Sequence, residues 1–179
     1  MNSKGEPDHS IEKNGVRFMR FAARPAAPNF RQMATPIAQC FQSVFGYDPL
    51  WNEGHVCDVC STPKSPVKFN YAEARERCDA GHPLRDFWSI EKILDDMQAE
   101  LAKPNATCFV AMVDEQVVGA SWGFTITCHE AEEHLGFPGM QSILRTAYPA
   151  ATHFIYLDEM FVLPNFQRRG IAKTLFRER

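Results

Sequence analysis

The stretch that decides the fold is residues 156–176, YLDEMFVLPNFQRRGIAKTLF. It starts as an apolar strand, bends at a proline and passes through QRRGIA (167–172) into the first turns of a helix. A loop that enters a helix N-terminus presents backbone N–H groups and the positive end of the helix dipole, which suit a phosphate. Gly170 lets the backbone approach a ligand closely because it has no Cβ, and Arg168 and Arg169 add donors for phosphate oxygens. The stretch therefore predicts an anion-binding loop, with an ordinary basic helix start as the alternative.

The loop resembles motif A of the GNAT superfamily of acyl-CoA-dependent N-acetyltransferases, in which Q/R-x-x-G-x-G/A holds the pyrophosphate of coenzyme A. Ala172 fills the last position of the pattern, and VLP (162–164) stands at the offset usual in the family. The resemblance implies acetyl-CoA as co-substrate. It also implies that the backbone of the preceding strand pairs with the pantetheine amides. The cofactor-binding residues so implied are Met160, Phe161, Val162, Gln167, Arg168, Arg169, Gly170, Ile171, Ala172 and Lys173.

Two neighbouring carboxylates, Asp158 and Glu159, lie on that strand. An amine is mostly protonated at neutral pH, so its acetylation needs a group that accepts the proton. By the resemblance, Asp158 falls where some small-amine members place a strand glutamate, and Tyr156 falls where histone-type members place theirs. We predict Asp158 as the base or amine-binding carboxylate and Glu159 as the second candidate; pairing with arginines or capping of sheet ends is the alternative for both. As neighbours on a strand, they are expected to point to opposite faces.

Hydrophobic periodicity extends the prediction to the whole chain. Strands are expected at 16–22, 107–113, 117–126 and 153–162, and helices at 35–45, 87–101, 129–147 and from 171 onward. This order predicts an α/β (α+β) fold that resembles the GNAT core from 16 to 179, with a mixed, mostly antiparallel central sheet flanked by helices. GNAT proteins continue after the motif A helix with more strands and a helix. Since the chain ends at Arg179, we expect a fragment or truncated product in which the C-terminal half of the fold is missing.

A second pattern is Cys57-x2-Cys60, followed after 17 residues by Cys78-x3-His82. Two thiolates two residues apart can hold one ion from a tight turn, and a second pair completes a tetrahedral set. The surrounding segment, 47–86, is poor in apolar residues and needs a staple. We therefore predict a zinc-binding insert there, with His55 as an alternative to His82. Four protein ligands make the site structural; a Cys57–Cys60 disulfide or unliganded thiols are the alternatives.

The composition narrows the function classes. The chain has 179 residues, 45% of them hydrophobic, and a formal net charge of −3, which suits one domain with a sizeable core. The mildly acidic balance argues against nucleic-acid binding, and no apolar run approaches the roughly 20 residues of a membrane span. Residues 1–15 carry no secretory signal and are expected to be a disordered lead-in. We expect a cytoplasmic protein whose six cysteines are reduced or metal-bound.

These observations predict an acetyl-CoA-dependent N-acetyltransferase that acetylates a primary amine of a small molecule, by direct attack of the amine on the thioester. The acidic residues near the site favour a cationic acceptor, such as a polyamine or an aminoglycoside. Neither a nucleic acid nor a membrane is expected as a partner, and a homodimer stays open. The alternative is a non-catalytic, zinc-containing binding module derived from a GNAT scaffold.

Overall fold

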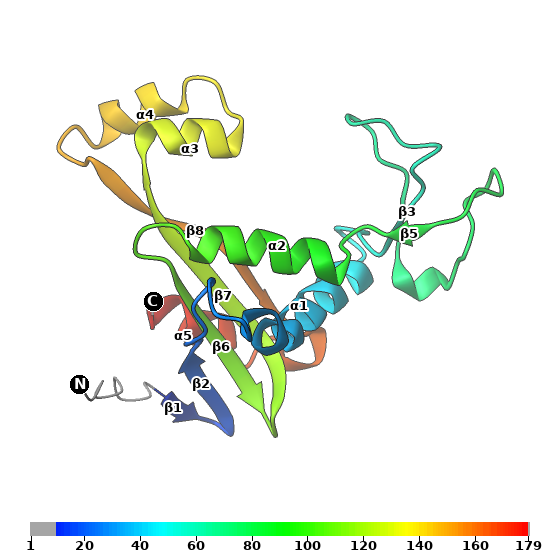
Figure 1. Cartoon of the computed structure of the whole chain (residues 1–179), viewed down its shortest axis with the longest axis horizontal. Coiled ribbons are helices and arrows are strands. Elements are labelled where there is room, and N and C mark those ends of the chain that lie inside the picture. Colours follow the sequence, from blue (N-terminus) through cyan, green and yellow to red (C-terminus); the bar gives the residue numbers. More distant parts are fainter. Residues whose placement is uncertain (1–9, 179) are drawn as a thin grey trace.

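The central element of the fold is a five-stranded sheet in which every pairing is antiparallel (Figure 1). The structure is a computed structural model that describes residues 10–178. The strand order is β1-β2-β6-β7-β8. The bounds are Ser10–Lys13 (β1), Val16–Arg20 (β2), Thr107–Val113 (β6), Gln116–Thr127 (β7) and His153–Val162 (β8). The predicted α/β class with an antiparallel sheet flanked by helices is confirmed.

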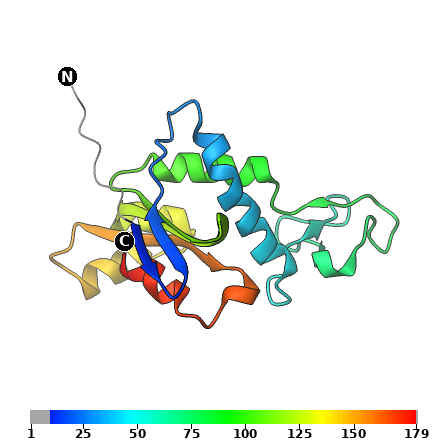
Figure 2. The same ribbon diagram turned by 90° about the horizontal axis from the view of Figure 1, so that it is seen from below.

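Helices cover both faces of this sheet (Figures 1 and 2). Helices α1 (Phe30–Tyr47) and α2 (Ile90–Leu101) lie on one face, where aromatic and aliphatic side chains form the larger core, including Phe41 and Trp122. Helix α5 (Ile171–Arg177) covers the other face and packs with Val118 and Val162. Strand β7 is buried on both faces over residues 117–124, because each face of the sheet carries its own helical cover.

The predicted boundaries of two segments need correction. Residues 10–13 are not lead-in, because they form strand β1 and pair with β2; residues 1–9 lie outside the described part of the chain. The first helix begins at Phe30, well before the predicted start at 35. Phe30 and Ala34 are buried in the core, so packing extends the helix through Pro36. Thr35 is therefore no N-cap, and its hydroxyl donates to the Arg31 carbonyl one turn back at 2.7 Å.

An arm at the far end of β7 and β8 carries two short helices, α3 (Cys128–Leu135) and α4 (Met140–Ala147). A single helix was predicted over 129–147. Gly136 instead ends α3 in a left-handed conformation (φ +59°), and Gly139 stands before α4 with φ +89°. The segment therefore folds as a helical hairpin.

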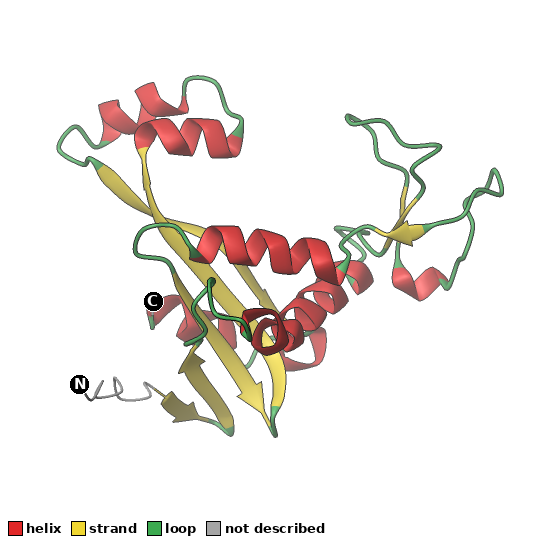
Figure 3. Ribbon diagram, in the orientation of Figure 1, coloured by secondary structure: helices red, strands yellow, loops and turns green. Residues whose placement is uncertain are grey.

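The insert (residues 47–86) projects from the ends of α1 and α2, away from the sheet (Figures 1 and 3). It contains three two-residue strands in the order β4-β3-β5. Their bounds are His55–Val56 (β3), Lys68–Phe69 (β4) and Arg85–Asp86 (β5), and a 3-10 turn η1 spans Tyr71–Glu73. A second 3-10 turn, η2 (Pro164–Phe166), connects β8 to the loop before α5.

Candidate active site and metal centre

A β-bulge in β8 determines where the two candidate carboxylates point. The pairing with β7 passes from Trp122↔Glu159 to Gly123↔Leu157, so Asp158 is an extra residue without a partner across the ladder. Two residues of a bulge oppose one residue of the partner strand, and the bulged strand bends there. Asp158 and Glu159 consequently line one cavity together with Trp122. The expectation that they point to opposite faces is wrong, because the bulge breaks the alternation on which it depended.

Asp158 is held by two neighbours. The Nε2 atom of His134 on α3 lies 3.0 Å from its Oδ1, and the Asp158 side chain is only 11% exposed. On the other side it meets Glu100 at the end of α2, whose Oε2 accepts a hydrogen bond of 2.6 Å from Trp122 Nε1. Burial and the hydrogen bond with Asp158 raise the pKa of Glu100 to about 8. At neutral pH Glu100 is therefore mostly a protonated acid that donates to the Asp158 carboxylate.

Glu159 is the third carboxyl group of this cluster. Burial, the adjacent Asp158 and the nearby Glu53 raise its pKa to about 7. Burial, followed by the charges of Asp158, Glu159 and Glu100, raises the pKa of Tyr156. The cluster is thus a region of strong negative potential in which one carboxyl group changes its protonation state near neutrality.

The cavity into which these groups face has a volume of about 160 Å³. Drug-sized ligands occupy sites of about 300–1,000 Å³, so this cavity suits the aminoalkyl end of a molecule. Four apolar or aromatic side chains and four acidic ones form its walls. Its lining consists of Phe41, Trp88, Ile93, Asp96, Glu100, Trp122, Asp158 and Glu159.

The predicted phosphate loop follows β8 and has the backbone of an anion nest. Arg168 (φ +64°) and Gly170 (φ +79°) both adopt left-handed conformations, and alternation of this kind turns successive N–H groups toward one side. The first intrahelical bond is from Thr174 N to Gly170 O, so the N–H groups of the first turn are open to a ligand. A Cβ added at Gly170 would meet no atom within 4 Å.

Some side chains of this loop are engaged in contacts within the loop, and others are exposed and could contact a ligand. Gln167 Nε2 donates to Val162 O at 3.1 Å, and Arg169 donates to Asn165 O at 3.0 Å and lies over the Phe166 ring. These two therefore stabilise the loop itself. The open members are exposed Arg168 and Lys173; Ile171 is buried against the sheet and anchors α5, and Ala172 packs beside the same cluster.

The outer edge of β8 is unpaired over the described residues 10–178. Leu163 N donates to Val118 O at 2.9 Å, and backbone groups alternate along an antiparallel ladder. The N–H and C=O groups of Met160 and Val162 therefore point to the open edge, and those of Phe161 point to β7. Of the three residues predicted to contact pantetheine, Phe161 offers no edge group, and its side chain is buried in the larger core.

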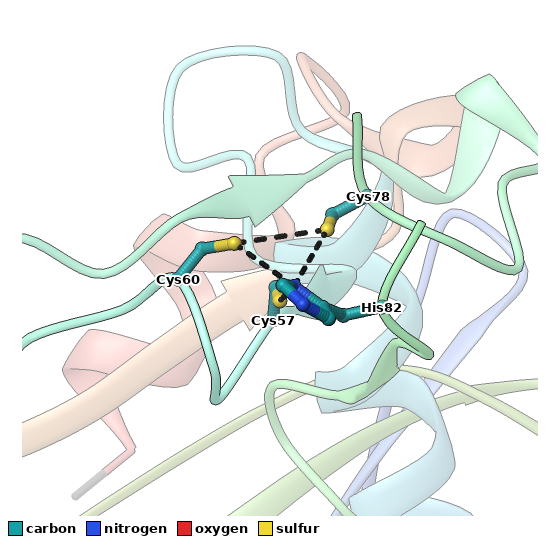
Figure 4. Close-up of side chains that lie close together, drawn as sticks. All are labelled: Cys57, Cys60, Cys78 and His82. Atoms are coloured by element: carbon teal, nitrogen blue, oxygen red, sulfur yellow. Dashed lines mark hydrogen bonds between the residues drawn. The ribbon is translucent and has the colours of Figure 1, made fainter. Parts of the chain in front are cut away.

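The four predicted metal ligands converge in the insert (Figure 4). Their ligand atoms all lie within 4.8 Å of one another. The Cys60 and Cys78 sulfurs are 3.8 Å apart, and His82 Nδ1 lies 3.9, 3.3 and 3.6 Å from the sulfurs of Cys57, Cys60 and Cys78. A zinc tetrahedron with the usual bond lengths has edges of about 3.8 Å between sulfurs and about 3.6 Å between sulfur and nitrogen. The cluster fits one ion.

The geometry argues against two alternatives for this cluster: His55 as the fourth ligand, and a disulfide. His55 lies apart from it, with its ring against Tyr71 at 4.7 Å and its Nδ1 3.5 Å from Asp86. All six cysteines lie within the described residues, and none forms a disulfide. The fourth candidate ligand is therefore His82.

Sequence patterns did not identify Glu100 and His134 as site residues. Glu100 lies at the end of an amphipathic helix, where a charged residue usually faces solvent, and only the packing of α2 on β7 brings it to Trp122. His134 belongs to the segment HEAEEH (129–134), whose histidine spacing does not fit a zinc protease motif. The arm folds back and places this histidine against β8. No local signal separates either residue from an ordinary helical surface residue.

Comparison with known proteins identifies the class of this site. Residues 70–178 match the acetyltransferase (GNAT) family, which is more than half of the chain. The match includes β6 to β8, the bulge and the loop before α5. By this match, the chain belongs to the GNAT family of acetyltransferases.

A solved structure of related shape is that of an aminoglycoside acetyltransferase from an uncultured soil metagenomic sample, in complex with trehalose. The two chains are 16% identical, the match covers 93% of this chain and 68% of that chain, and the TM-score is 0.43. So distant a likeness has no bearing on the acceptor. No curated protein matches the chain significantly. Among the described helices, none has both the length and the apolar character that crossing a membrane requires.

Proposed function

We propose that the chain is an acetyl-CoA-dependent N-acetyltransferase that acetylates a primary amine of a cationic small molecule. The observation that carries this proposal is the bulge in β8, which places Asp158 and Glu159 in one cavity beside the strand that leads to the phosphate loop. A cavity with several carboxyl groups favours an ammonium group over a neutral or anionic one. Membership of the family supports acetyl transfer as the reaction, and the acidic cavity supports a cationic amine as the acceptor.

The carboxyl groups divide the chemistry between them. Asp158, fixed by His134 and Glu100, binds the incoming ammonium group. Glu159, with a pKa of about 7, accepts the proton that the amine must lose, because a base works best when its pKa lies near the working pH. The free amine then attacks the thioester carbonyl, the C–N bond forms and the C–S bond breaks. The proton that the nitrogen loses on becoming an amide passes through water to the departing thiolate, and coenzyme A leaves as the thiol.

The loop and the strand edge would hold the co-substrate. The open N–H groups at the start of α5, with Arg168 and Lys173, are placed to receive the phosphates of acetyl-CoA. The edge N–H and C=O groups of Met160 and the edge N–H of Val162 are placed to pair with the pantetheine amides, as an added strand would, whereas Val162 O already accepts from Gln167 Nε2. Binding of this kind directs the acetyl end along β8 toward the bulge.

Calorimetric titration of acetyl-CoA, followed by a thiol-release assay with a panel of amines, tests the proposal. We expect saturable binding that Gly170→Glu abolishes, since a carboxylate at the nest repels phosphate. We expect turnover with a cationic amine, and a fall in kcat of about 10²-fold or more in Glu159→Gln, with acetyl-CoA affinity unchanged. Glu12→Gln, on the exposed strand β1, is the matched control. Binding of acetyl-CoA without turnover of any amine would contradict the proposal and favour a non-catalytic binding module.

We also propose that the cluster of Cys57, Cys60, Cys78 and His82 holds a structural zinc ion. Three thiolates and an imidazole are a preferred zinc ligand set. With four protein ligands no coordination position is left for substrate, so zinc would stabilise the insert and take no part in the chemistry. The cytoplasm, where thiols stay reduced, is the location that we propose for the protein. Metal analysis of the purified chain should find one zinc per molecule.

A further inference from the structure

The insert has almost no apolar core of its own. Its buried cluster consists of Cys57, Phe69 and Cys78, with Val67 and Leu84 packed against it. Two of the three buried members are thus thiols of the candidate metal site. Its strands are two residues long. A segment of this size with so small a core needs a further stabilising link, such as a metal ion, to hold one conformation.

The cluster joins the two chain segments that connect the insert to the rest of the domain. Cys57 lies four residues after Glu53, and His82 lies six residues before Trp88. Between these points the segments are tied by the two-residue pairing of β3 with β5 and one further backbone hydrogen bond. The ion pair of Arg85 with Asp58 and the contact of His55 with Asp86 at 3.5 Å add to this, but partly exposed pairs of this kind contribute little. The metal cluster is therefore the main tie between the segments.

Glu53 and Trp88 extend this tie to the acceptor cavity. Glu53 Oε2 accepts a hydrogen bond of 2.7 Å from Trp88 Nε1, and its Oε1 accepts one of 2.9 Å from Lys68. The Trp88 ring lines the cavity and contacts Phe41 edge-on at 5.6 Å. The Glu53 carboxylate is also near enough to contribute to the raised pKa of Glu159. A shift of the insert would therefore move one wall of the cavity and change its charge.

We infer that the metal ion in the insert fixes this wall: by clamping residues 53–57 against 82–88, it positions Glu53 and, through it, the Trp88 ring that contacts the acceptor. Glu53 is a positioning residue in this arrangement. The inference rests on the proposed zinc site, and its kinetic consequence rests on the proposed acetyl transfer. Losing the metal should loosen the wall on the acceptor side and leave the phosphate loop unaffected, because Ile171 and Leu175 anchor the following helix in the core of the sheet domain.

NMR of the tryptophan side chains in the full chain tests this without any activity measurement. The chain has three tryptophans, so ¹⁵N labelling gives three indole N–H signals, and Trp88→Phe assigns one. On stripping zinc with a chelator, we expect the Trp88 signal to shift or broaden. The Trp122 signal, held by Glu100 within the sheet domain, should stay in place. Restoring one equivalent of zinc should restore the Trp88 signal. An unchanged Trp88 signal, or a chain that binds no zinc, would overturn the inference.

Three variants separate the effect of the metal from the effect of the Glu53–Trp88 hydrogen bond. Cys60→Ser, at the exposed ligand, should lose zinc and shift the Trp88 signal, whereas Cys128→Ser, a cysteine outside the cluster, should do neither. Glu53→Ala should keep one zinc per chain yet still shift the Trp88 signal; no shift would contradict the role of Glu53.

In turnover, zinc loss should raise the acceptor KM about tenfold or more with the KM of acetyl-CoA unchanged. An equal rise in both would refute a specific effect on the acceptor wall. If zinc binds and the Trp88 signal responds but no amine is acetylated, the proposed function fails and the structural inference stands.

Discussion

Replacing Glu159 by glutamine should stabilise the fold at high pH while it lowers the acetylation rate. The pKa of Glu159 is raised from 4.5 to about 7, first by burial and then by Asp158 and Glu53. Below the unfolded value both states are protonated, so the carboxyl group has no pH-dependent effect. As pH rises toward 7 the unfolded chain loses its proton and the folded chain keeps it, so folding stability falls. Above pH 7 the carboxyl group is ionised in both states, so the loss of folding stability has reached its full size and no longer changes with pH.

The magnitude follows from the size of the pKa change. Each pKa unit corresponds to about 1.36 kcal/mol, so the buried carboxylate costs the folded state about 3 kcal/mol at pH 8.5. Glutamine has nearly the same shape and no charge. Its effect on the free energy of unfolding should therefore be about 3 kcal/mol more favourable at pH 8.5 than at pH 4.5.

Urea denaturation of the wild type and Glu159→Gln at the two pH values measures this difference directly. Any packing effect of the amide is the same at both pH values and cancels. The exposed Glu12→Gln should show no comparable difference. If the effect of Glu159→Gln were the same at pH 4.5 and 8.5, the reasoning that this carboxyl group is charged against its environment would be refuted.

Four further outcomes are expected. The kcat for an amine should rise with pH through about 7, as Glu159 becomes the charged base, and a rate that does not change across this range would remove it from that role. Gly119→Ala should destabilise the fold by about 1–3 kcal/mol, because its Cβ would stand 2.8 Å from the Phe161 carbonyl; chemical denaturation measures the cost, and a neutral result would contradict it. On the same strand, Ser121→Ala should raise the free energy of unfolding by about 1 kcal/mol, since the buried Ser121 Oγ has no hydrogen-bond partner among the described residues. Zinc removal should make residues 56–84 cleavable by a protease that leaves the sheet domain intact, and equal resistance would count against the metal as a staple.

Those parts of the protein that are encoded locally were predictable from the sequence. The spacing of Cys57 and Cys60, and of Cys78 and His82, predicted a cluster that the fold brings together. The bounds of β6 and β8 were predicted to the residue, since apolar runs between turn-forming residues mark strand ends. The start of α5 directly after Gly170 was also predicted, because the QRRGIA loop (167–172) places a glycine before the helix, and the structure shows that glycine in a left-handed conformation.

The acidic cavity was not predictable in the same way, because it depends on how distant segments meet. The bulge at Asp158 is a mismatch of register between β7 and β8 and leaves no mark in the sequence of either strand alone. Glu100 reaches the site only through the position of α2 over Trp122. The raised pKa values of Glu100 and Glu159 follow from that burial and proximity, so strand periodicity and helical stripes predicted the framework of the site and not its electrostatics.

The open edge of β8 has a consequence for the behaviour of the protein in concentrated solution. An unpaired strand edge is a template for any other extended chain, and Ile155 (80% exposed) and Met160 (38% exposed) add apolar surface beside it. The backbone groups that suit pantetheine would equally accept a strand of a neighbouring molecule. Acetyl-CoA seated on this edge would then compete with self-association, and the ligand would keep the protein dispersed as well as supply its acetyl group.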